Sequence, residues 1–440
     1  MTLAEYIKQN YNNSPYWFEQ ECEQSWHRDR IDNILNIKEY LSGKHAILSR
    51  PDEVYNGRTF KTRKIVLQYA KTILNFQTSF LLGKPATLSG DEKSIKELKQ
   101  VYKKSKYNDI DYKILDKLCK YGEIYEYLYF NNDNRIKSKL INPEDGYPIY
   151  DDSLEYIGFI EHYTSNGVSY WNVFSDNEVT EWTNAGGYMH ILGQYNNVSG
   201  LPVIYKTLNE MDERQGRSDL EDYVNILDNM EELISKYADA FYKFLNPIPV
   251  VTGTKLNIGK NGEGAVDANT VGYALQLDDG SNFNLVTNRM DYKSLETIYN
   301  MLRQALLDIS MTPSIITSGV EISNVSETSI KMLYSMAQIK AQINSKYLVD
   351  GFRYRWKLMQ KMLKLQNIDI DARDVEVVFN MSIPQNDEEI ITNLKTLNEI
   401  GAISLESILA NSPYCNDVEG EKARIENSKK VVTEPINQDK

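Results

Sequence analysis

Residues 217–253 read RSDLEDYVNILDNMEELISKYADAFYKFLNPIPVVTG, and this stretch decides the fold. Residues 217–245 contain no Gly or Pro, and their apolar side chains recur at spacings of three, four and seven. That period predicts one long helix with an apolar face. Ser218 with Glu221 three residues later is the capping-box pattern that begins a helix. The helix ends where Asn246-Pro247-Ile248-Pro249 begins a β segment.

A second amphipathic helix is predicted over residues 291–310, with Leu302 and Leu306 in its apolar stripe. Short strands are expected between the two helices, over 248–252, 271–277 and 283–286. Two helices joined by a small β head form a stalk that cannot bury its own apolar stripes. The chain is therefore expected to pack against copies of itself, as one subunit of a ring.

Composition limits the class of protein. A chain of 440 residues with 41% hydrophobic and 25% charged residues predicts two or three compact globular units. A net charge of −13 argues against a protein that grips nucleic acid over its whole surface, but it is compatible with a channel that holds DNA loosely. Only 4 histidines leave few candidates for acid–base chemistry near neutral pH.

Targeting and redox signals are also absent from the sequence. The three cysteines, Cys22, Cys119 and Cys415, form no CxxC pair, which argues against a zinc ribbon or a disulfide framework and favours a reducing cytosol. We find no signal sequence and no apolar run of 18 residues, so we expect no membrane partner.

The first 120 residues are predicted to be mainly helical, with helices over 63–82, 94–104 and 110–121. After Gly122 the pattern changes to aromatic and β-branched segments separated by Asn-, Asp- and Gly-rich turns, which predicts an antiparallel meander. The expected strands cover 124–130, 156–163, 168–174, 178–182 and 188–192.

The C-terminal third begins with a polar break over 311–325. The longest predicted helix follows over 326–365, with a possible bend at Gly351. A strand over 375–379, helices over 387–399 and 404–410, and a polar tail over 429–440 complete the chain.

Enzyme signatures are scarce. The glycines of residues 259–264 lack the Lys-Ser/Thr of a phosphate loop, and Ser218 lacks the second Gly of a nucleophile elbow, so a helix cap explains it better. Paired acidic residues at Asp109 and Asp111 and at Asp151 and Asp152 leave one alternative, a metal-dependent nuclease or nucleotidyltransferase. Solvated caps beside turns explain the same residues, and we expect no enzyme, cofactor or metal.

Four stretches together resemble the portal (connector) proteins of tailed bacteriophages, of the type found in siphophages of Gram-positive hosts. They cover roughly residues 60 to 425, and their order and spacing carry the resemblance rather than any single motif. They are NFQTSFLLGKP (75–85), YGEIYEYLY (121–129) with IYDD (149–152), LPVI (201–204) through GRSDLE (216–221) to ADA (238–240), and VVFN (377–380) with GAISLES (401–407).

The resemblance implies an α+β portal fold with wing, stem helices, β clip, tunnel loop and helical crown. The implied parts follow the chain in order. They are the wing (1–217), stem helix 1 (218–246), the clip (247–290), stem helix 2 (291–310), the tunnel loop (311–325), a long wing helix with a returning strand (326–384), the crown (385–427) and a flexible tail (428–440).

It also implies a function and a set of partners. Such a protein forms a ring of about twelve subunits at one capsid vertex, assembled in the host cytoplasm, and passes double-stranded DNA during packaging and ejection. The implied partners are the terminase large subunit, the head–tail adaptor, and the major capsid and scaffolding proteins. A ring-forming scaffold that passes no DNA is the remaining alternative.

Three sets of residues are the candidates for these contacts. The tunnel loop has no Lys or Arg, which suits sliding DNA but equally fits an ordinary polar loop. The charged residues of the clip fit a protein-docking surface. The aromatic stem residues face either a neighbouring subunit or the core of their own chain. The tunnel-loop residues are Thr317, Ser318, Val320, Glu321, Ile322, Ser323 and Asn324; the clip residues Lys255, Lys260, Asp278 and Asp279; the stem residues Tyr223, Tyr237, Phe241, Phe244, Leu302 and Leu306.

Overall fold

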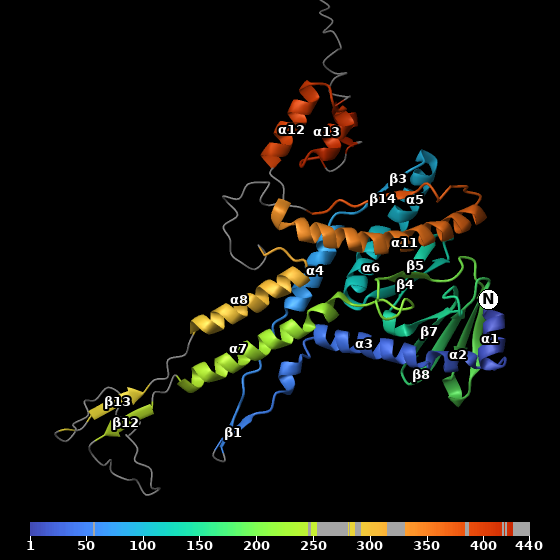
Figure 1. The fold of residues 1–440 in the computed structure, drawn as a ribbon. Helices are drawn as coiled ribbons and strands as arrows, with labels where there is room; N and C mark the ends of the chain where they lie inside the picture. The colour runs from blue at the N-terminus through green and yellow to red at the C-terminus, as the bar shows by residue number, and fades with distance from the viewer. Residues whose placement is uncertain are drawn as a thin grey trace, which may run out of the picture. The chain divides into compact units, whose positions relative to one another are not determined.

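The structure is a computed structural model, and it describes residues 1–55, 58–244, 248–252, 280, 282–286, 292–314, 331–382, 387–415, 418 and 420–425. The chain divides into two compact units. The first comprises residues 1–314 and 336–381, and the second comprises residues 315–335 and 382–440. The secondary structure is mixed α and β throughout the first unit (Figure 1).

Helices dominate the start of the first unit, as the sequence predicts. Thr2 and Glu5 form a capping box on the first helix, in which each residue's side chain bonds the other's backbone. The elements are α1 (Leu3–Tyr11), α2 (Trp17–Cys22), α3 (Ser25–Leu41), the 3₁₀ turn η1 (Ala46–Ser49), the hairpin strands β1 (Glu53–Tyr55) and β2 (Arg58–Phe60), α4 (Tyr69–Leu82), β3 (Thr87–Ser89), α5 (Glu92–Ser105) and α6 (Tyr107–Tyr121).

The helix predicted over 63–82 is wrong in its first turns, because α4 begins only at Tyr69. Residues 63–67 are not helical, and their backbone N–H groups bond side chains of another helix, as described below. The apolar spacing at Ile65 and Val66 continues the helical pattern by coincidence. Tertiary hydrogen bonds override that local preference.

Five strands form the antiparallel meander in the order β10-β9-β8-β7-β6. The segment predicted over 124–130 is a strand, but it leaves the meander and lies at the centre of a second sheet, β11-β4-β5. The last strand of the meander begins two residues later than predicted, at His190. The bounds are β4 (Glu123–Phe130), β5 (Ile136–Ile141), η2 (Pro143–Asp145), β6 (Gly146–Tyr150), β7 (Tyr156–Ser165), β8 (Val168–Phe174), β9 (Glu178–Thr183), η3 (Ala185–Gly187), β10 (His190–Asn196) and β11 (Val203–Lys206).

The meander lies between two layers. The first core contains Tyr11, Trp17, Phe18 and Cys22 from α1 and α2 together with Ile160 and Trp171 of the meander. The second contains Tyr125 and Tyr127 of β4 together with Phe159, Phe174 and Val179. Burial on both faces explains why these strands are so rich in aromatic residues.

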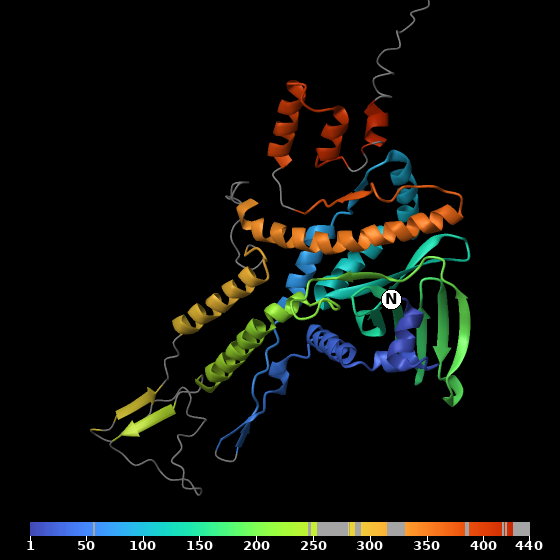
Figure 2. The ribbon, with the colours of Figure 1, turned by 45° about the vertical axis from the view of Figure 1, so that its right-hand side comes forward.

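The helix of residues 217–245 starts as its capping box predicts, with one difference. Ser218 and Glu221 do form the box, but it caps a short 3₁₀ turn, η4 (Asp219–Asp222), and α7 (Val224–Phe244) follows directly. Strands β12 (Ile248–Thr252) and β13 (Asn282–Val286) pair antiparallel, and α8 (Tyr292–Ile309) returns beside α7. Figures 1 and 2 show both helices extending away from the sheets of the unit.

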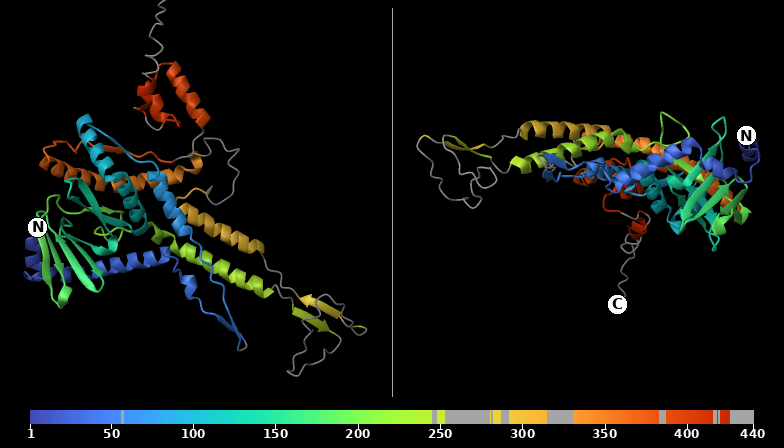
Figure 3. Two further views of the ribbon diagram at one scale, coloured as in Figure 1. Left: turned by 180° about the vertical axis from the view of Figure 1, so that it is seen from behind. Right: turned by 90° about the horizontal axis from the view of Figure 1, so that it is seen from below.

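The longest helix, α11 (Ser335–Leu365), runs without interruption through Gly351. Close packing explains that glycine, since a Cβ there would lie 2.1 Å from the Tyr205 ring. Helix α4 lies between α11 and the bases of α7 and α8, as the view from behind in Figure 3 shows. Strand β14 (Glu376–Val378) lies within the strand predicted over 375–379 and pairs with β3. Strand β3 was not predicted from the sequence.

The second unit contains α12 (Asp387–Glu399) and α13 (Leu405–Asn411). Both helices lie where the sequence predicts them. Ser404 caps α13 by accepting a hydrogen bond from the Ser407 backbone N–H.

Candidate functional site: the paired helices α7 and α8

The α7–α8 pair is held to the rest of the first unit by one apolar core. That core joins Leu220, Tyr223, Leu227 and Met230 with Leu306 of α8 and with side chains of α3 and α4. Tyr69 and Tyr299 add a hydrogen bond between their hydroxyl groups, 3.1 Å apart. The base of the pair is therefore fixed within a single chain.

Other large apolar side chains of the pair lie open to solvent, at the base of α8 as well as farther out. Ile298 is 48% exposed, Met301 is 68% exposed and Ile309 is 47% exposed. Their spacing of three and eight residues places them within an arc of about 80° on α8, at 100° per residue. On α7, Phe241 is 48% exposed and Tyr242 is 53% exposed. An exposed apolar surface of this kind is typical of an interaction site.

The predicted contact residues therefore separate into two groups. Tyr223 and Leu306 are fully buried inside the chain, so their side chains have no surface left for a neighbour. Tyr237 and Leu302 are partly buried, and Phe241 is exposed. The side chain of Phe244 lies outside the described residues. Of the apolar stripe, only its outer part remains available for contact with another molecule.

An extended segment, residues 61–68, is bound along α7 by alternating backbone bonds. The N–H of Arg63 donates to Asp239 Oδ1 at 2.8 Å, that of Ile65 to Ser235 Oγ at 3.0 Å, and that of Leu67 to Glu231 Oε1 at 2.7 Å. Every second residue of an extended chain thus meets an acceptor one helical turn earlier on α7. We call residues 61–68 the strap.

Two further side-chain contacts reinforce the strap. His45 Nδ1 lies 2.7 Å from Glu231 Oε1, and both side chains are buried. Arg50 Nη1 lies 2.8 Å from Asp239 Oδ2. Burial raises the pKa of Glu231, which the hydrogen bond from Leu67 partly offsets. Sequence reasoning missed this anchorage, because His45 and Glu231 are 186 residues apart.

The long helix α11 is tied to the sheets by a buried arginine. Arg355 binds Asp111 of α6 and Glu126 of β4, the latter at 2.7 Å. Arg30 makes a comparable buried pair with Glu123 of the same strand. Neither arginine was predicted from the sequence. Of the residues in these pairs, only Asp111 is among the acidic residues that the sequence singles out.

The paired acidic residues of the enzyme alternative do not come together. Asp111 is committed to Arg355, and Asp151 Oδ2 accepts a hydrogen bond from the N-terminal amine of Met1 at 2.9 Å. Within the described part of the chain, no three His, Cys, Asp or Glu side chains are grouped so as to hold a metal ion. Ser218 is a helix cap, as predicted.

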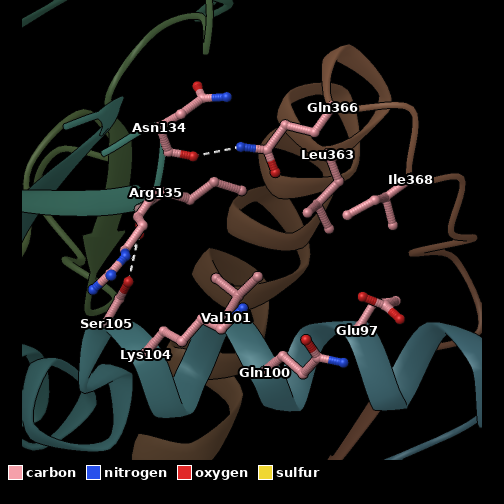
Figure 4. Close-up of a pocket in the computed structure, with 11 residues that line it drawn as sticks. Glu97, Gln100, Val101, Lys104, Ser105, Asn134, Arg135, Leu363, Gln366 and Ile368 are labelled. Carbon is pink, nitrogen blue, oxygen red and sulfur yellow. Dashed lines mark hydrogen bonds between the residues drawn. The ribbon is translucent and has the colours of Figure 1, made fainter. Parts of the chain in front are cut away.

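Pockets on the described surface are small or shallow. Figure 4 shows one of about 100 Å³ between α5, the β4–β5 turn and the end of α11, lined by Val101, Arg135 and Leu363 among others. It contains no grouping of nucleophile, base and orienting residue. No helix among the described residues is both long and apolar enough to span a bilayer.

The remaining predicted sites lie outside the described residues. They are the tunnel-loop residues 317, 318 and 320–324 and the clip residues 255, 260, 278 and 279.

Comparison with known proteins identifies the class. The chain belongs to the SPP1 Gp6-like phage portal protein family, whose family model matches residues 22–434. It is thus a structural component of a bacteriophage virion, at the portal vertex, and not an enzyme. The nuclease or nucleotidyltransferase alternative is therefore wrong.

Individual relatives are distant. The portal protein of Bacillus phage SPP1 is 22% identical over 395 residues, which cover 81% of this chain and 74% of that protein. Among solved structures, the neck of an empty GTA particle is similar with a TM-score of 0.48 at 10% identity, covering 76% of this chain and 86% of the other. The virion of a native gene transfer agent particle gives a TM-score of 0.47 at 10% identity, covering 78% and 89%.

Proposed function

We propose that copies of this chain close into a ring of about twelve subunits, with the α7–α8 pairs side by side as the stem around a DNA channel. The ring occupies one capsid vertex and passes double-stranded DNA during packaging and ejection. Membership of the portal family supports the class, and the exposed apolar stripe on the α7–α8 pair carries the assembly.

The stripe favours contact between subunits because of its position. Ile298, Met301 and Ile309 lie beside the face of α8 that packs on α7, not opposite to it, so a second α7–α8 pair can cover them edge to edge. Covering apolar surface contributes about 25 cal/mol per Å² to the free energy of association. A head-to-tail contact of this kind, repeated by rotation, closes into a ring.

The proposed parts follow the boundaries given above. Residues 1–217 form the wing, the segment 247–290 forms the clip, and residues 311–325 line the channel as the tunnel loop. We propose that the clip, with Lys255, Lys260, Asp278 and Asp279, docks the terminase large subunit during packaging and the head–tail adaptor afterwards. Major capsid and scaffolding proteins are the other proposed partners of the ring.

The stem assignment is tested by placing a charge in the stripe. Phe241→Asp and Met301→Asp should each block ring formation, because an unpaired carboxylate would be buried in an apolar contact. Native mass measurement and negative-stain electron microscopy of the purified protein report the subunit number and the axial hole.

Met211→Asp is the matched control, since Met211 is 91% exposed on a loop outside the stripe and its substitution should leave rings intact. Rings of normal size from Phe241→Asp and Met301→Asp would overturn the stem interface. Rings without an axial hole wide enough for duplex DNA would instead show a scaffold that passes no DNA.

A further inference from the structure

Strand β10 has an unpaired outer edge in the described part of the chain. Strand β10 pairs with β9 on one side, and no described strand pairs with its other side. It lies at the end of the first unit away from α7 and α8 (Figure 2). An edge of this kind presents free N–H and C=O groups to any extended chain that approaches it.

The edge carries unusually many exposed apolar side chains. Leu192 is 60% exposed, Ile191 is 47% exposed and Tyr195 is 45% exposed, with Tyr188 and Val198 exposed on either side of the strand. Proteins usually protect edges with Lys or Pro, and β10 has neither. Its one irregularity is a bulge between Ile191 and Gly193.

The bulge limits where a further strand could pair. From Gly193 to Asn196, β10 keeps a regular register with Glu181 to Glu178 of β9. A bulge increases the local twist, so a partner strand would pair with this regular part and stop near Leu192. The side chain of Leu192, in β10, would then lie beside the end of the added strand and give it an apolar contact.

The chain segment that forms the meander carries one sign of charge. Residues 140–205, which include the whole meander, contain nine Asp or Glu and no Lys or Arg. Glu178 is exposed beside the edge, and Glu181 lies against β10, with an oxygen that would be 3.1 Å from a Cβ on Gly193. Glu181 also accepts a hydrogen bond from Tyr195 at 3.3 Å.

This charge selects the occupant. Nucleic acid and anionic surfaces are repelled, and so is a second copy of the same edge. Extension of the sheet from one copy to the next would need β6, the other edge of the meander, but β6 is buried and a Cβ on Gly146 would lie 2.3 Å from the Tyr125 ring. A basic polypeptide segment remains.

We propose that the outer edge of β10 binds an extended, Lys- or Arg-bearing segment of a different virion protein, which adds to the meander as a sixth strand. Main-chain hydrogen bonds supply the affinity, Leu192 and Tyr195 supply apolar contacts, and Glu178 and Glu181 pair with the basic side chains. The contact rests on the proposed function, since it needs the chain to be part of a particle, but it does not need the stem interface.

Photo-crosslinking in assembled particles tests the site. A benzoylphenylalanine replaces Gln194, an exposed residue within the regular part of β10, and in the control it replaces Met211. After irradiation, mass spectrometry should find Gln194 joined to an extended basic segment of another virion protein, with no such product from Met211. Cross-links only to DNA or to another copy of this chain, or none at all, would overturn the proposal.

Charge and apolar variants then test the chemistry. In the cross-linking background, Leu192→Lys and the double change Glu178→Lys with Glu181→Lys should each lower the yield at Gln194 at least fivefold. Met211→Lys should leave it unchanged. An unchanged yield from both edge variants would refute the assignment. Normal rings from these variants would separate this result from a failure of the stem interface, and unaltered thermal melting would exclude misfolding.

Discussion

At the scale of single residues, the first unit depends on a few charged side chains that are buried far from water. Arg355 is fully buried, and its partners Asp111 and Glu126 come from a helix and a strand more than two hundred residues earlier. Burial raises the pKa of Asp111 to about 6, although Arg355 opposes that shift. One arginine thus holds α11 to α6 and β4, two elements that lie far earlier in the chain.

We expect Arg355→Leu to lower the free energy of unfolding by about 3–5 kcal/mol, because it leaves two carboxylates buried without a cation. Denaturant unfolding followed by circular dichroism measures the change. Arg373→Leu removes an ion pair with Asp371 whose arginine side chain is 87% exposed, and it should cost less than about 1 kcal/mol. Equal unfolding midpoints for the two variants would contradict the role given to Arg355.

A buried histidine makes stability depend on pH. His27 stacks on Trp26 with ring centres 3.6 Å apart, and burial lowers the pKa of His27 to about 4 from an ordinary value of 6.5. Between these values the unfolded chain binds a proton that the folded chain does not. Stability from this group is therefore complete above pH 6.5 and is lost as the pH falls towards 4.

His27→Phe keeps an aromatic ring in place but cannot bind a proton. From pH 7 to pH 5 the wild-type protein should lose about 2 kcal/mol of unfolding free energy more than the variant does. Denaturant titrations at the two pH values give this difference directly. If both proteins lose the same amount, His27 is not the group responsible.

At the scale of elements, the strap explains how α7 is held beside the N-terminal hairpin. Its bonds join residues 61–68 to one face of α7, and Arg50 joins the other root of the β1–β2 hairpin to Asp239. The hairpin itself has strands of only three residues each. A two-stranded hairpin of this size is marginal alone, so its rooted ends keep it in position.

We expect Asp239→Ala to loosen the strap without unfolding the sheets, because Asp239 accepts from both Arg50 and the Arg63 backbone. Amide hydrogen exchange should accelerate at least tenfold for residues 61–67, which corresponds to about 1.4 kcal/mol, and stay unchanged in β6 to β10. Glu232→Ala, on the exposed face of the same helix, is the control. Faster exchange throughout the unit would show global destabilisation instead.

At the scale of the whole molecule, a channel must combine tight contacts between subunits with weak contacts to DNA. In the proposed ring, the exposed stripe on α7 and α8 would serve the first requirement. For the second, the proposed tunnel loop, residues 311–325, contains Glu321 and no Lys or Arg, so phosphate groups in the proposed channel would meet no cation that holds them. If this segment is instead an ordinary polar loop, its removal would not change DNA packaging.

Deleting residues 317–324 should therefore leave rings intact and impair the packaging or retention of DNA. Electron microscopy checks the rings, and nuclease-protected DNA per particle measures packaging. Deletion of residues 433–440, the same number of residues from the polar tail, is the control. Normal DNA content after the first deletion would remove the tunnel-loop assignment.

Elements whose patterns are local could be predicted from the amino-acid sequence alone. The capping box at Ser218, the apolar period of α7 and α8, the Ser404 cap of α13 and the aromatic strands of the meander could all be predicted, because helix and strand periods are set by neighbouring residues. The order of these elements was enough to indicate the family before any comparison.

Which elements meet is visible only in the tertiary structure. It converted residues 63–67 from a predicted helix into a strap, moved β4 into a second sheet, paired Arg355 with Asp111, and buried Tyr223 while leaving Phe241 exposed. Each outcome depends on partners distant in the chain. Periodicity shows that a side chain is apolar and on which face it lies, but the free energy of burial belongs to the pair of surfaces that come together.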